Sequence, residues 1–109
     1  MSEPVSYEEF AKLDLRICKV VKAEKMEGRS KLVKLTVDVG DEIRTIVAGG
    51  AEYYAPEQFV GRTMVIVANL KPKLIAGVES KGMLLAADIG GRPVWLTVDE
   101  EVSPGTKIR

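Results

Sequence analysis

The chain has no histidine and only one cysteine, Cys18, among its 109 residues. The absence of histidine excludes Ser-His-Asp triads, histidine general acid–base catalysis and histidine metal sites. A single cysteine forms neither an internal disulfide nor a thiolate zinc cluster, which fits a reducing, cytoplasmic setting. No apolar run approaches the ~20 residues of a membrane-spanning helix, so no membrane partner is expected.

Motifs for phosphate binding and catalysis are also missing. Neither GxxxxGK[ST] nor GxGxxG occurs in the chain. With no histidine to activate it, Cys18 is expected to be a half-buried packing residue rather than a nucleophile. Adjacent carboxylates lie at expected helix starts or turns, where solvated charge explains them: Glu8/Glu9, Asp41/Glu42 and Glu100/Glu101. We therefore predict a binding module that is not an enzyme and uses no cofactor and no metal.

The net charge of zero conceals an uneven distribution of charged residues. Residues 15–37 contain seven Lys or Arg and two Glu, and residues 69–81 contain three Lys and one Glu. The remaining sequence is therefore acidic overall. A neutral total can hide one basic face, and a polyanion responds to that local field. The alternative is that these lysines are the ordinary solvated residues of strand outer faces.

Apolar and polar residues alternate in a pattern typical of an all-β domain with short helices. Ser6 and Glu9 have the spacing of a capping box, so a short helix is expected to about Lys12, with Phe10 and Leu13 facing inward. Five strands are predicted, at residues 15–24, 32–39, 43–48, 63–69 and 82–87. The alternation of the first strand is imperfect, which indicates a bulge or a strand that coils around a small barrel.

The second strand alternates cleanly, so its buried residues can be predicted. They are Val33, Leu35, Val37 and Val39. Gly40-Asp41 then predicts a tight hairpin turn into the third strand, which carries Arg44 on or near its outer face. Between the third and fourth strands, residues 51–60 predict a loop and a short helix with Pro56 at its first turn.

Three aromatic residues of this connection have two possible uses. Tyr53, Tyr54 and Phe59 could close the bottom of a barrel, or they could stack on bases. Helical spacing beside a proline favours core packing.

The stretch from Asn69 to Ala87, NLKPKLIAGVESKGMLLAA, connects two apolar strands. Turn residues punctuate it and lysines lie in its middle, which is typical of an exposed binding loop held by buried strands. Residues 88–109 predict a covering tail with a Gly90-Gly91 turn, a strand at residues 93–98 and a last turn at residues 103–105. Trp95 is expected to be buried in this tail, either in the monomer core or at a subunit interface.

Five strands with a helix between the third and fourth predict an OB-fold, a small Greek-key barrel. We divide the chain into an arm and helix (1–13), the barrel (14–87) and a C-terminal extension (88–109), within one structural domain. OB-folds bind nucleic acid through the face of strands 2 and 3 and the loops 1–2 and 4–5. These two loops, residues 25–31 and 69–81, hold much of the positive charge, which favours a nucleic-acid partner.

Several motifs also resemble one known family. They are LDLRICKV (13–20), SKL (30–32), VDVG (37–40), RTIVAG (44–49) and above all the block from Asn69 to Ala87. In these residues the chain closely resembles the tRNA-binding domain that occurs at the C-terminus of methionyl-tRNA synthetases, as a free-standing β subunit or small tRNA-binding protein, and in the endothelial-monocyte-activating polypeptide family. The resemblance implies an OB-fold with a C-terminal extension, a homodimer and recognition of the tRNA body by its structure. A separate methionyl-tRNA synthetase catalytic subunit is the implied protein partner.

Carried over by position, the resemblance implies a set of tRNA contacts. The main ones are Lys31, Lys71, Ser80 and Met83. Charge and expected exposure add Lys34, Arg44, Lys73 and Lys81. The lysines would neutralise phosphates, Ser80 would hydrogen-bond backbone or ribose, and Met83 would pack against a sugar or base.

The chain departs from the family pattern at two places. Cys18 stands where the family usually has glycine, so the first strand is expected to bend less there. Residues 26–30 replace a His-Pro-acidic loop, which leaves the loop shape and any contact by Arg29 open. A dimeric, polypeptide-binding chaperone of the same fold family is the alternative function, although Leu70-Lys71 and residues 78–83 follow the tRNA-binding version.

Overall fold

The computed structural model describes residues 2–109, and most of their regular structure is β-strand. The elements are α1 (Tyr7–Phe10), β1 (Leu15–Lys25), β2 (Leu32–Asp38), β3 (Ile43–Gly49), the 3₁₀ helix η1 (Pro56–Gln58), β4 (Thr63–Val67), β5 (Lys73–Ile75), β6 (Val78–Ser80), β7 (Met83–Leu84), β8 (Ala86–Ile89), β9 (Arg92–Trp95) and β10 (Lys107–Ile108).

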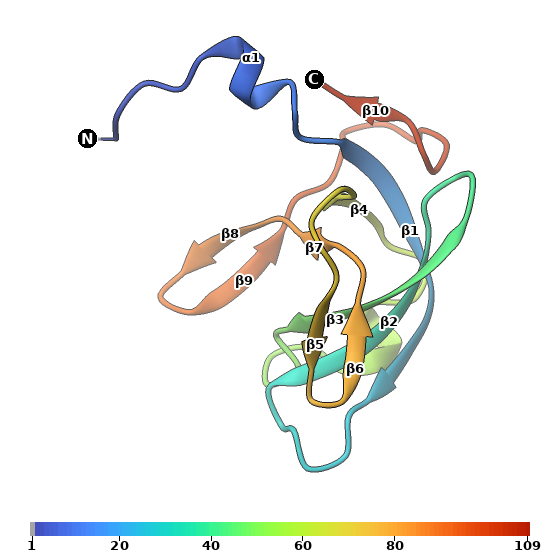
Figure 1. The fold of residues 1–109 in the computed structure, drawn as a ribbon. Coiled ribbons are helices and arrows are strands. Elements are labelled where there is room, and N and C mark those ends of the chain that lie inside the picture. Colours follow the sequence, from blue (N-terminus) through green and yellow to red (C-terminus); the bar gives the residue numbers. More distant parts are fainter. Residues whose placement is uncertain (1) are drawn as a thin grey trace.

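The long strand β1 is the middle strand of the barrel sheet, and Figure 1 shows it along one side of the barrel. The sheet order is β3-β2-β1-β4-β7, and all these neighbours are antiparallel. The register of β1 on β2 shifts between Val20 and Lys22, which confirms the predicted bulge. This irregularity lets one strand pair with β4 along its first half and with β2 along its second half. The element η1 lies between β3 and β4, as predicted for an OB-fold.

The barrel interior is aliphatic. Val33, Leu35, Val37 and Val39 are all buried in it, which confirms the inward face predicted for the second strand. Phe59, one residue after η1, closes one end of this core, and its ring meets those of Tyr54 and Trp95 edge-on. Tyr53 was expected in the same plug, but its side chain is 48% exposed.

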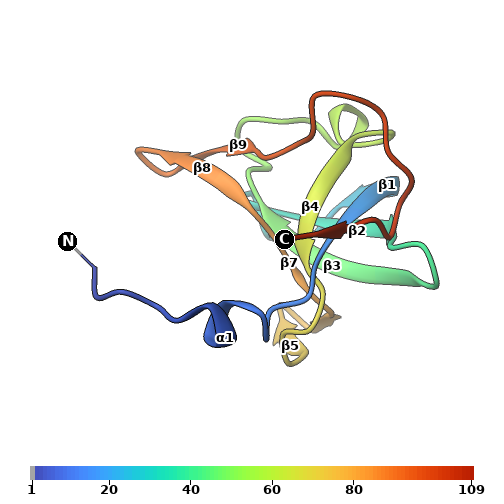
Figure 2. The same cartoon turned by 90° about the horizontal axis from the view of Figure 1, so that it is seen from above.

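The N-terminal helix forms as its capping residues predict. Ser6 Oγ accepts from the Glu9 N–H at 3.1 Å, and the Glu9 carboxylate accepts from the Ser6 N–H. The prediction that Phe10 and Leu13 face inward is wrong, because they are 40% and 42% exposed. The helix has only four residues, and none of them is buried. Figure 2 shows α1 to one side of the barrel strands.

The stretch between β4 and β7 is more ordered than a loop. It contains a β-hairpin, β5–β6, whose two turn residues Ala76 and Gly77 both have positive φ, as a type I′ turn requires. The predicted fifth strand at residues 82–87 is divided into β7, which completes the barrel, and β8, which leaves it.

The C-terminal tail forms two separate structures. Its strands β8 and β9 make a hairpin that projects from the barrel, with the predicted Gly90-Gly91 turn at its tip (Figure 1). The last strand, β10, returns to pair with the start of β1. Gly40 and Gly105 make this return possible, because a Cβ on Gly40 would lie 2.8 Å from the Gly105 Cα. Within residues 2–109, no helix has the length and apolar character needed to cross a membrane.

Candidate nucleic-acid interface

The β5–β6 hairpin is fixed to the outer side of β3 by two hydrogen bonds. The Val47 N–H donates to Ser80 Oγ at 3.0 Å, and the Lys81 N–H donates to the Thr45 carbonyl at 3.0 Å. Ser80 is only 4% exposed, and its hydroxyl also donates to the Gly82 carbonyl. The Ser80 hydroxyl thus accepts the hydrogen bond of the Val47 N–H in place of a backbone carbonyl from a neighbouring strand. Ser80 was expected to contact an RNA backbone, but its burial gives it the role of holding the hairpin in place.

Arg44 connects the hairpin to the barrel. It stands opposite buried Val37 in the β2–β3 register, so its side chain starts from the face of β3 that is turned toward the barrel interior. The expectation of an outer-face position is therefore wrong. At the end of the barrel the guanidinium donates to the carbonyls of Ala68 and Lys81 and pairs with Glu42. Arg44 thereby joins both ends of the segment that carries the hairpin.

Asn69 makes a second clamp at the start of the same segment. Its Oδ1 accepts from the Asp14 N–H at 2.8 Å, and its Nδ2 donates to the Lys12 carbonyl at 2.6 Å. Sequence reasoning noted Asn69 only as the beginning of a block and missed this function. The available signal was a single amide residue placed directly after a buried strand.

A groove of about 460 Å³ runs between β3 and the hairpin. Its lining includes three of the expected cations: Lys34, Arg44 and Lys81. Lys81 is exposed and lies 3.7 Å from the Glu79 carboxylate. Lys71 and Lys73 are exposed at the base of the hairpin. The structure therefore gathers most of the predicted basic residues around one element.

Two expected contacts lie away from this groove. Lys31 is exposed at the end of the β1–β2 loop, three residues before Lys34 and so roughly 10 Å from it along the strand. Met83 is half exposed on β7, beside a hollow that Trp95 also lines. Met83 is therefore accessible and is not a fully buried core residue.

Comparisons with known proteins identify the family of this chain. A family model described as a putative tRNA binding domain matches residues 15–107. The chain belongs to this family. Methionine–tRNA ligase of Archaeoglobus fulgidus is 53% identical over 106 residues, which are 97% of this chain and 16% of that protein. The enzyme of the same name from Thermotoga maritima is 52% identical over 104 residues, 95% of this chain and 16% of that protein.

Solved structures show the same fold for this tRNA-binding domain. A MetRS-related protein from Pyrococcus horikoshii has a TM-score of 0.93 at 42% identity, covering 99% of this chain and 100% of that one. The chaperone CsaA of Bacillus anthracis has a TM-score of 0.89 at 32% identity, covering 98% of this chain and 100% of that one. The OB-type barrel predicted from the strands is thereby confirmed.

The tRNA-binding domain is a non-catalytic module, and the chain spans only 16% of the ligases described above. Its one thiol fits that conclusion. Cys18 is fully buried rather than half-buried, and this burial raises its pKa to about 12. At neutral pH the thiol stays protonated, so it serves as a small apolar residue of the core.

Proposed function

We propose that the domain binds folded tRNA through the hairpin, the groove beside it and the end of the β1–β2 loop. The observation that carries this proposal is the fixed hairpin, whose groove is lined by Lys34 and Lys81 and whose base carries Lys71 and Lys73. Lys31 extends the same surface. These lysines would bind phosphates, while Met83 would pack against a sugar or base. Arg44 and Ser80 act as positioning residues.

Recognition of tRNA structure rather than base sequence follows from the chemistry of this surface. A lysine ammonium is a point charge that binds phosphates wherever the RNA fold presents them. The outward positions of β2 and β3 include Lys34, Thr36, Thr45 and Val47, and none of these is aromatic. A sequence-tolerant single-strand binder would instead need aromatic platforms along this face.

We propose that this binding serves a methionine–tRNA ligase. The support is that about half of the aligned residues are identical to those of proteins of that name. This chain covers only a small part of each of those proteins. A tRNA-binding domain joined to or associated with a catalytic part raises the local tRNA concentration there. We further propose that the domain acts in the cytoplasm as a homodimer formed through the tail from residue 88 onward.

The test is a salt titration of binding to folded tRNA, unfolded RNA and single-stranded DNA. Folded tRNA should bind most tightly, and each lysine–phosphate contact should contribute about 0.9 to the slope of log K against log salt. The Lys71→Ala variant should lower that slope by about one contact. Lys19→Ala is the matched control, because Lys19 is exposed beside the C-terminal tail. Equal affinity for all three nucleic acids would contradict structure-specific recognition.

A polypeptide-binding function is the second candidate. Its support is the similarity of this chain to CsaA of Bacillus anthracis, a protein described as a chaperone. The two functions separate in one competition experiment. A permanently unfolded polypeptide should fail to displace labelled tRNA if the basic surface is the binding site. Displacement that persists in the Lys71→Ala variant would favour the chaperone function.

A further inference from the structure

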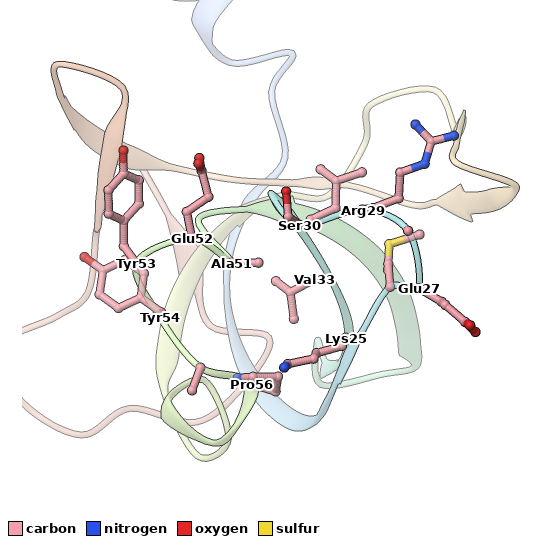
Figure 3. A pocket seen from close by; sticks show the side chains of 14 residues that line it. Lys25, Glu27, Arg29, Ser30, Val33, Ala51, Glu52, Tyr53, Tyr54 and Pro56 are labelled. Carbon is pink, nitrogen blue, oxygen red and sulfur yellow. The ribbon is translucent and has the colours of Figure 1, made fainter.

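A cavity of about 800 Å³ opens between the β1–β2 loop and the segment from Ala51 to Pro56 (Figure 3). Val33 and Ala51 lie at its centre, and Tyr53 and Tyr54 stand together on one side. Its volume is in the range of small-molecule sites, which are mostly apolar with a few polar groups at defined positions. This cavity is separate from the groove beside the hairpin.

The two tyrosines differ in what they can do. Tyr54 is fixed, because its hydroxyl donates to the Pro93 carbonyl at 2.8 Å and its ring packs against Phe59 and Trp95. Tyr53 is 48% exposed and has no such ring contacts among residues 2–109. The N–H groups of both residues donate to the Gly50 carbonyl. A well-held backbone therefore presents one accessible aromatic ring beside a rigid wall.

Charges of both signs surround the cavity. Lys25 is the last residue of β1 and Arg29 lies in the β1–β2 loop, and neither forms an ion pair within the described part of the chain. Glu27 and Glu52 supply carboxylates. An aromatic ring, an unpaired cation and a carboxylate match three features of a nucleotide: the π-face of the base, the phosphate and an exocyclic amino group on the base edge.

The cavity is also continuous with the proposed tRNA surface. The Ala51 N–H donates to the Lys31 carbonyl at 3.3 Å, so the cavity begins where the basic loop ends. Thr45 in the groove lies on β3 and Ala51 in the cavity follows two residues after β3 ends, so the six positions from one to the other span at most roughly 20 Å. One RNA strand can therefore reach both places.

We propose that this cavity takes one unstacked nucleobase of the bound tRNA, with its ring on Tyr53 and its phosphate beside Arg29. The inference rests on the proposed function and adds a base-binding subsite to a surface that otherwise contacts phosphates. It also assigns a role to Arg29, whose contact the loop sequence leaves open.

The test compares Tyr53→Ala with Tyr53→Phe, which keeps the ring. Tyr53→Ala should weaken tRNA binding by roughly 5- to 150-fold, the effect of losing one base–aromatic stack, whereas Tyr53→Phe should bind normally. The salt slope should stay unchanged in both variants, because no phosphate contact is lost. Since Tyr53 is half exposed, both variants should unfold at the temperature of the unmodified chain.

A second measurement uses a trinucleotide with 2-aminopurine at its central position, at low salt. Its fluorescence should be quenched by the unmodified chain and by Lys71→Ala, but not by Tyr53→Ala. Failure of the unmodified chain to quench it, or tRNA binding that depends on Lys71 and not on Tyr53, would overturn the base subsite alone. Failure of the unmodified chain to bind tRNA would overturn both proposals.

Discussion

Arg44 illustrates how one side chain can be basic, close to a binding surface and still serve the fold. Its Nε and Nη1 donors go to one carboxylate and two backbone carbonyls, which leaves only the two Nη2 donors for a phosphate. Its strand phase could have been predicted, because Arg44 alternates in step with the buried residues Ile46 and Ala48. The sequence could not predict that the carbonyls of Ala68 and Lys81 lie within reach of Arg44, because these residues are 24 and 37 positions away from it.

Arg44→Ala should therefore weaken tRNA binding indirectly. We expect a loss of roughly tenfold, equivalent to one charge-assisted hydrogen bond, together with faster amide exchange of the hairpin. Hydrogen exchange followed by mass spectrometry measures the second effect. Lys71→Ala is the comparison, because it should weaken binding and leave exchange unchanged. Unaltered exchange in Arg44→Ala would mean that the arginine contacts RNA directly.

Ser80 presents the same difficulty to sequence reasoning. A serine in a basic stretch is typical of a phosphate or ribose contact, and nothing in its neighbours marks it as buried. Its burial follows from the approach of the hairpin to Val47, a contact between residues 33 positions apart. Lys71 and Lys73 were easier to place, because a charged side chain in a turn-rich segment is nearly always exposed.

Among the elements, β5 and β6 were missed for a physical reason. Each has three residues and shows no strict alternation, and the hairpin gains its order from the clamps on β3 and on Asp14 rather than from its own propensity. The strand predicted at residues 82–87 divides because β8 diverges from β4 to pair with β9. The first four strands carry stronger patterns, and their predicted positions agree with the structure within about two residues.

Gly82 sets how closely β7 can approach β4. It has φ 136°, and a Cβ at this position would lie 2.7 Å from Ile66 Cδ1 in the core. We expect Gly82→Ala to lower the free energy of unfolding by about 2–4 kcal/mol, the sum of overpacking and backbone strain. Gly61→Ala is the matched control. Its φ is 86° with no atom within 4 Å of the added Cβ, so only the strain of about 1–2 kcal/mol remains. Urea unfolding should separate the two, and equal losses would contradict the close approach.

The start of β1 holds a carboxylate whose titration affects stability. Arg16 Nε donates to Asp14 at 2.9 Å, which lowers the pKa of that carboxyl below its ordinary value of 3.8, and Lys107 lies 3.7 Å away. A lowered folded-state pKa contributes stability above pH 3.8, and this contribution disappears as the pH falls through the folded-state value. Asp14→Asn should therefore reduce stability at pH 7 and reduce it much less at pH 2. Urea midpoints across this range test the difference, and a constant difference would contradict the linkage.

For the molecule as a whole, Trp95 joins the tail hairpin to the barrel. Its ring packs against Phe59 and Tyr54, and its Nε1 is buried without a hydrogen-bond partner within residues 2–109. The sequence predicted burial of this residue in the core or an interface, and the packing shows that the monomer core accounts for at least part of it. This contact forms because the tail hairpin folds back onto the segment that contains Tyr54 and Phe59. The spacing of residues along the sequence could not predict it.

Trp95→Ala should lower the free energy of unfolding by about 2–3 kcal/mol, somewhat below the effect for a fully buried tryptophan. Trp95→Phe should cost much less, because the aromatic packing remains and the unpaired N–H is removed. Sedimentation velocity on the same variants tests the proposed homodimer. If Trp95→Ala changes the sedimenting mass but not the unfolding of the barrel, the residue serves an interface instead.

The pairing of β10 with β1 sets how the domain responds to mechanical load. Leu15, where the barrel begins, lies directly opposite Ile108, where it ends. Because the two strands are antiparallel and their outer ends adjoin, a force pulling the termini apart opens this pair one hydrogen bond at a time instead of shearing all of them together. The contact of Gly40 with Gly105 and the Ile17–Thr106 hydrogen bond come next in line. Under tension between larger partners, the C-terminal strand would peel away first, while the hairpin and its clamps on the other strands stay closed.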